Sequence, residues 1–266
     1  MTSNAVQLDI DNGIATVKLN QPEVRNALTH ELRTAFRDII GSLEFNKEVR
    51  CVVITGAGDH FMAGGDIRAM VKRLELDEVE RRKLILEGIH LLHLPLLAIR
   101  RMGKPVVASI QGAAAGFGVG LVAACDLAIA ADDAFFTLAY CHIGASPDGG
   151  SSYFLGRTLG MKHQMELALL GDRFGAERAK ELGIVNWTVP RNELENETRQ
   201  LAKRLANGPT RAYANSKHLF NQTNHLSMES QLQMEAEKMA DSMLTDDHAE
   251  GINAFMKKRK PTFKGH

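Results

Sequence analysis

The chain has 266 residues, 44% of them hydrophobic and 24% charged, which is typical of a globular protein large enough to bury a core. Its 32 basic residues balance its 32 acidic residues, and no apolar stretch is long enough to span a membrane. We therefore expect neither nucleic acid nor a membrane as a partner.

Strand and helix patterns alternate along the first part of the chain. Residues 13–20 alternate apolar and polar side chains, as a half-buried strand does. Residues 26–44 place their apolar side chains on one helical stripe. Further β-rich stretches predict strands over 49–58, 104–114 and 125–137.

The pattern changes after about residue 190. From Glu193 to Lys258 the chain is compatible with helix nearly throughout, with breaks at Gly208–Pro209 and near Thr245–Asp247. The sequence therefore predicts an α/β core over 1–190 and a helical part over 191–266.

The cysteines and the N-terminus bear on the compartment. Cys51, Cys125 and Cys141 are odd in number and lack metal-ligand spacing, so we expect reduced thiols and no metal site. The first ten residues lack a basic stretch followed by an apolar run, so no signal peptide is expected. These features predict a cytoplasmic protein.

Two runs of very small residues follow predicted strands. One is "HFMAGGDI" (60–67), and the other is "QGAAAGFGVG" (111–120). Glycine lets a ligand approach the backbone, and a helix N-terminus presents unpaired N–H donors. A single loop of this kind often serves only packing. A pair in one domain favours N–H groups that converge on an oxyanion.

Five motifs in order resemble the crotonase, or enoyl-CoA hydratase/isomerase, superfamily. They are "NQPEVRNAL" (20–28), "FMAGGDI" (61–67), "QGAAAGFGVGLVAACDLAIAA" (111–131), "SPDGGSSYFLGRTLG" (146–160) and "GINAFMKKRKPTF" (251–263). The resemblance implies a spiral of ββα turns with a C-terminal helical trimerisation region, assembled as a homotrimer or homohexamer. It also implies an acyl-CoA thioester substrate and no cofactor besides the coenzyme A of that substrate.

The same resemblance assigns site residues. The thioester oxygen would accept hydrogen bonds from the backbone N–H groups of Ala63 and Phe117. Coenzyme A would lie along Arg25, Ala27, Gly65, Asp66 and Ile67. Phe255 and Lys258, near the end of the chain, match positions that often close the site from a neighbouring subunit.

The chain departs from the hydratase pattern at both acid/base positions. Hydratases of the superfamily carry glutamates that correspond to Gly120 and Tyr140 of this sequence. The remaining carboxylate is Asp148, in "SPDGG", at a position that is acidic in several isomerases. An Asp before Gly-Gly-Ser also caps turns, but the resemblance favours a catalytic role.

These departures leave four functions open. We favour an enoyl-CoA isomerase in which Asp148 moves a proton from one carbon to another. The combination of His93, Tyr140 and Asp148 resembles the hydrolytic dehalogenases that act on aroyl-CoA, in which the Asp attacks carbon. The third and fourth candidates are an enoyl-CoA hydratase and a non-catalytic acyl-CoA binder. Tyr140 is expected to line the acyl pocket, and His93 to lie at its rim.

Overall fold

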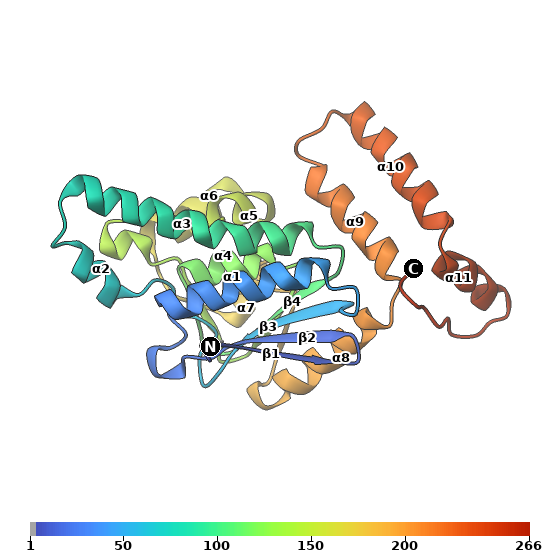
Figure 1. The fold of residues 1–266 in the computed structure, drawn as a ribbon, viewed down its shortest axis with the longest axis horizontal. Helices are drawn as coiled ribbons and strands as arrows, with labels where there is room; N and C mark the ends of the chain where they lie inside the picture. Colours follow the sequence, from blue (N-terminus) through green and yellow to red (C-terminus); the bar gives the residue numbers. More distant parts are fainter. Residues whose placement is uncertain (1–3) are drawn as a thin grey trace.

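The computed structural model describes residues 4–266 and is an α/β structure with two sheets (Figure 1). The larger sheet has the strand order β1-β2-β3-β4-β6-β9, antiparallel at β1-β2 and parallel elsewhere; the smaller has the order β5-β7-β8. The strands are β1 (Val6–Asp11), β2 (Ile14–Leu19), β3 (Cys51–Gly56), β4 (Val106–Ile110), β5 (Ala113–Ala115), β6 (Leu127–Ala131), β7 (Phe135–Thr137), β8 (Phe174–Gly175) and β9 (Trp187–Val189).

Helices cover the larger sheet and form the C-terminal part. The α-helices are α1 (His30–Phe45), α2 (Ile67–Arg73), α3 (Glu78–Arg101), α4 (Phe117–Ala124), α5 (Ser151–Thr158), α6 (Met161–Leu170), α7 (Ala176–Glu181), α8 (Leu194–Ala206), α9 (Thr210–Gln222), α10 (Met228–Met243) and α11 (Asp246–Met256). Short 3-10 helices are η1 (Pro22–Val24), η2 (Tyr140–Ile143) and η3 (Arg191–Glu193). Figure 1 shows α1 and α3 on one side of the sheet, α8 on the other, and α9–α11 extending away from it.

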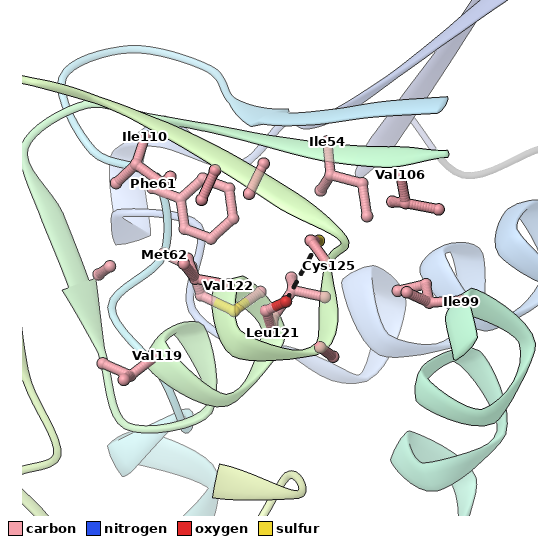
Figure 2. Close-up of a cluster of buried hydrophobic side chains, with 14 of the residues drawn as sticks. Ile54, Phe61, Met62, Ile99, Val106, Ile110, Val119, Leu121, Val122 and Cys125 are labelled. Atoms are coloured by element: carbon pink, nitrogen blue, oxygen red, sulfur yellow. Dashed lines mark hydrogen bonds between the residues drawn. The ribbon is translucent and has the colours of Figure 1, made fainter. Parts of the chain in front are cut away.

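The apolar core anchors both runs of small residues. Phe61 and Met62, which precede the first run, are fully buried. Val119 and Leu121, on α4, belong to the same buried cluster (Figure 2). Each large side chain of this kind contributes roughly 1.5–3 kcal/mol when it is buried. The two runs are therefore fixed to one core.

The helical part is held to the core by a partly buried ionic cluster. Lys217, on α9, lies 2.7 Å from the Asp126 carboxylate and donates to the carbonyl of Ile99. Arg100 approaches the same carboxylate at 3.2 Å. The first helix after residue 190, α8, packs on the sheet through Leu194, Ala202 and Ala206. The extended part of the structure thus begins at α9.

Two expected features, the buried cysteines and the helix breaks in the C-terminal part, are confirmed. Cys51 and Cys125 are free and buried, and burial raises the pKa of each thiol to about 12. Within residues 4–266 no helix is both long and apolar enough to cross a bilayer. Helix α8 ends before Gly208–Pro209 and α10 ends before Thr245, as the sequence predicts. The structure adds a further break, between α9 and α10, that the sequence pattern does not predict.

Candidate active site

The two loops of small residues meet in space. Met62 forms a parallel bridge with Ala114, and its carbonyl accepts from the N–H of Ala115 at 2.9 Å. Gly64 has a φ of +86°, and a Cβ added to it would lie 2.8 Å from the carbonyl oxygen of Ala115. A larger residue at position 64 would separate the loops. The glycine at position 64 therefore allows the backbones of the two loops to lie in direct contact.

A third loop, before α1, supports the first one. Asn26 is fully buried with a φ of +54°, and its amide donates to the carbonyls of Ala57 and His60 at 3.0 and 2.8 Å. Sequence reasoning singled out the neighbours of Asn26 but missed this residue. The sequence did hold a signal for it: an Asn stands directly before the helix pattern, and Asn adopts the left-handed backbone region more readily than most residues.

This third loop corrects one assignment. The N–H of Ala63 donates to the carbonyl of Arg25 at 2.9 Å, so it is not free to bind a ligand. The N–H groups of Gly65 and Phe117 have no acceptor within residues 4–266. Phe117 is the first residue of α4, where the positive end of the helix dipole adds to the attraction for an anion. The available pair of donors is therefore Gly65 and Phe117, in place of Ala63 and Phe117.

Asp148 lies in the turn before α5 and is half-buried. Its Oδ1 accepts a hydrogen bond from the hydroxyl of Tyr140 at 2.6 Å. Burial, and then the charge of Asp148, raise the pKa of Tyr140 above its ordinary value, so the phenol stays neutral and donates. The Asp148 carbonyl also accepts from the N–H of Ser151 at 3.1 Å, which fixes the turn.

The position of the first hydratase glutamate is closed. A Cβ added to Gly120 would lie 2.5 Å from the carbonyl oxygen of Gly149. Gly149 has a φ of +59°, and the ring of Phe117 occupies the space where its side chain would lie. Since these neighbours are backbone and a buried ring, position 120 has no room for a carboxylate side chain.

The residues expected along the coenzyme A path lie close to the first loop. Arg25 is exposed and Ala27 is half-buried. The carboxylate of Asp66 caps α2 by accepting from the N–H groups of Arg68 and Ala69 at 3.0 and 3.3 Å. Ile67 begins that helix and is exposed. The side chain of Asp66 therefore has a structural role as the cap of α2.

Other expected site residues lie apart from this group. Phe255 and Lys258, at the end of α11, are exposed and lie at the opposite end of the molecule from α2 (Figure 1). His93 is exposed on α3, with its ring 6.0 Å from that of His90. In the described part of the chain His93 forms no hydrogen bond with Tyr140 or Asp148. Residues 4–266 contain no cluster of three potential metal ligands.

Comparisons with known proteins agree with the motifs. The model of the enoyl-CoA hydratase/isomerase family matches residues 9–266. A protein of Rhodobacter capsulatus named "Probable enoyl-CoA hydratase" is 35% identical over the full length of both chains. The 1,2-epoxyphenylacetyl-CoA isomerase of Escherichia coli is 31% identical over 96% of this chain and 97% of its own. The crystal structure of an enoyl-CoA hydratase from Polaromonas sp. JS666 superposes with a TM-score of 0.90 at 35% identity, covering 98% of this chain and all of that one.

Proposed function

We propose that this chain, which belongs to the enoyl-CoA hydratase/isomerase family of the crotonase superfamily, is an enoyl-CoA isomerase with a single catalytic carboxylate. The proposal rests on the residues found at the two positions where hydratases of the family carry their acid/base glutamates. Position 120 is a glycine, and the backbone of Gly149 leaves no room there for a side chain. Position 140 is a neutral tyrosine whose hydroxyl donates a hydrogen bond to Asp148. Asp148 is left as the carboxylate that can exchange a proton with the substrate.

The proposed reaction starts from a 3-enoyl thioester. The Asp148 carboxylate removes a proton from the α-carbon, and the electron pair of the broken C–H bond moves to the thioester oxygen. The N–H groups of Gly65 and Phe117 donate to this oxyanion, and each such donor contributes about 3–4 kcal/mol to the transition state. The protonated Asp148 then returns the proton to the γ-carbon, which produces the 2-enoyl thioester.

The residues present favour isomerisation over hydration. Hydration needs one group that activates water and a second that protonates carbon. Gly120 and Tyr140 stand at the two positions where hydratases carry glutamates, and Asp148 is the carboxylate of this turn. A single carboxylate suffices for isomerisation, since the α- and γ-carbons of a bent acyl chain lie on one face of it. His93 is exposed and forms no hydrogen bond with Asp148 in the described part of the chain, which favours isomerisation over a hydrolytic reaction that uses His93 as its base.

The remaining assignments complete the proposal. Coenzyme A lies along Arg25 and Ala27 and meets the backbone of Gly65, Asp66 and Ile67. The protein works in the cytoplasm as a homotrimer or homohexamer, and Phe255 and Lys258 of one subunit close the site of the next. Support comes from large apolar side chains exposed on α11 and directly after α10, including Leu244, Phe255 and Met256 at 87%, 81% and 74%. Such patches mark interaction surfaces.

The test is a panel of enoyl-CoA thioesters incubated in deuterated water or in ¹⁸O-labelled water and followed by mass spectrometry. Isomerisation leaves the oxygen content unchanged and moves the double bond, and deuterium enters the product to the extent that the proton on Asp148 exchanges with solvent before it is returned. Hydration or hydrolysis incorporates ¹⁸O. Binding without any turnover indicates an acyl-CoA binder, and any of these last three results contradicts the proposal.

A further inference from the structure

We infer that Tyr140 is a positioning residue that holds one oxygen of Asp148 and thereby assigns proton transfer to the other oxygen. The inference rests on the proposed function, because it concerns the same carboxylate. It goes beyond the sequence expectation that Tyr140 lines the acyl pocket.

The first step is that the two carboxylate oxygens of Asp148 differ in their hydrogen bonds. Oδ1 of Asp148 accepts from the Tyr140 hydroxyl at 2.6 Å, a short distance that is typical of a hydrogen bond to a charged acceptor. Oδ2 has no hydrogen-bond partner within residues 4–266. A carboxylate held at one oxygen cannot rotate freely about its Cβ–Cγ bond. The lone pairs of Oδ2 are then presented in one direction.

The second step is the contact of the same ring with the oxyanion loop. A Cβ added to Gly116, whose φ is +52°, would lie 3.7 Å from Cζ of Tyr140. The N–H of Gly116 donates to the carbonyl of Thr137 at 2.9 Å, which fixes this glycine against the strand before η2. Gly116 directly precedes Phe117, whose N–H is one of the two proposed donors.

The third step joins these contacts. The Tyr140 ring lies beside the loop that carries an oxyanion donor, and its hydroxyl donates to the base. Phe117 makes the reciprocal contact, since its ring packs on Gly149, the residue after Asp148. Two aromatic rings therefore set the separation between the base and the donor. The donor must reach the thioester oxygen while the base reaches the γ-carbon. The separation between donor and base therefore affects turnover more than ground-state binding.

The fourth step concerns the hydroxyl of Tyr140. In the described chain it is the side-chain group that donates a hydrogen bond to the Asp148 carboxylate, and the raised pKa of Tyr140 keeps the phenol neutral. The phenol therefore remains a donor to Oδ1 and does not replace Asp148 as the base.

The experiment compares wild type with Tyr140→Phe, which keeps the ring and removes the hydroxyl. Tyr153→Phe is the matched control, because the Tyr153 hydroxyl bonds to His225 on the surface. The readouts are kcat and KM on the preferred enoyl-CoA and the chemical shift of the Asp148 carboxyl carbon by ¹³C NMR, assigned with Asp148→Asn. For Tyr140→Phe we expect kcat to fall by about 10- to 100-fold, the usual value of a hydrogen bond to a charged group, with little change in KM. We also expect the Asp148 carboxyl chemical shift to change in Tyr140→Phe, because the hydrogen bond to Oδ1 is lost, and to stay unchanged in Tyr153→Phe.

Two results would overturn the inference. One is a Tyr140→Phe enzyme with the kcat of wild type; the other is a lower kcat with an unchanged chemical shift of the Asp148 carboxyl carbon, which would indicate a purely structural role. The failure of the proposed function is a different result: wild type then isomerises no enoyl-CoA. The carboxyl chemical shift still decides the link between Tyr140 and Asp148 in that case.

Discussion

The Cβ position of Gly120 lies 2.5 Å from the carbonyl oxygen of Gly149, so helix α4 is in backbone contact with the turn that carries Asp148. The carbonyl group of Gly149 occupies the space that a glutamate side chain at position 120 would need. It ties the identity of residue 120 to the position of the proposed base.

Gly120→Ala is expected to lower the free energy of unfolding by about 1–3 kcal/mol, because the added methyl group overpacks the contact with Gly149. Gly41→Ala is the matched control on α1, where a Cβ meets nothing within 4 Å; it should raise stability by about 0.5–1 kcal/mol. Urea denaturation measures both. Gly120→Glu should not hydrate enoyl-CoA, and a soluble, active hydratase from this variant would show that the position is open.

Gly64→Ala tests the contact between the two loops. The added methyl group would meet the carbonyl oxygen of Ala115 at 2.8 Å in a backbone with positive φ, and would displace Gly65 from Phe117. We expect kcat to fall by about 10²-fold, as for the loss of one oxyanion donor, while acyl-CoA still binds. Gly175→Ala, with open space around its Cβ, serves as the control. Wild-type kcat in Gly64→Ala would refute the donor pair.

The sequence predicted the core elements better than the site geometry. The alternating residues of β2 and the apolar run of β3 are local patterns, and both strands lie within the predicted ranges. Helix α1 starts at His30 rather than at Asn26, since Arg25 and Asn26 adopt the left-handed region and Thr29 caps the helix.

Backbone hydrogen bonds between distant segments leave no local pattern. The choice between Ala63 and Gly65 as donor depends on where the carbonyl of Arg25 lies, some forty residues earlier in the chain. The sequence also showed that Gly120 is no carboxylate, but only the packing of Gly149 shows that none would fit. Patterns therefore identified the loops, whereas tertiary contacts decide which groups in them are free.

Asp148→Asn is expected to keep the shape of the site and lose the proton acceptor. Tyr140 can still donate to the amide oxygen at position 148, so the turn should persist. Turnover should fall by about 10²- to 10⁴-fold, the usual range for a general base, with acyl-CoA affinity retained. Asp172→Asn, at an exposed carboxylate, is the control for the same chemical change. Near-normal isomerisation by Asp148→Asn would remove this residue from the mechanism.

Arg25→Ala and Lys258→Ala test the coenzyme A path. Both side chains are exposed, and each is free to meet a phosphate group. We expect each substitution to weaken acyl-CoA binding by roughly 5- to 50-fold, as the loss of one charge-assisted contact does. Calorimetry of the full-length protein gives the affinity, and Lys257→Ala provides a neighbouring control. Unchanged affinity in both variants would place coenzyme A elsewhere.

Lys104 predicts a pH dependence of stability. Its ammonium group is buried and donates to the carbonyls of Leu43 and Asn46 at 2.8 and 2.6 Å. Burial, and then the charge of Lys217, lower the pKa of Lys104 from 10.5 to about 8. Between these two pH values the unfolded chain keeps a proton that the folded protein has released. The free energy of unfolding therefore rises with pH across this window, by up to about 1.4 kcal/mol per pH unit.

Lys104→Met removes the titrating group, so the difference in unfolding free energy between wild type and this variant should grow in favour of wild type from pH 8 to 10.5. Urea denaturation under reducing conditions at several pH values measures the two slopes. Cys51 and Cys125, whose pKa values burial raises, contribute equally to both proteins and cancel. Lys162→Met, on the exposed face of α6, should leave the wild-type slope unchanged. Parallel curves for wild type and Lys104→Met would mean that Lys104 keeps its proton throughout this range, held by the two carbonyls it contacts.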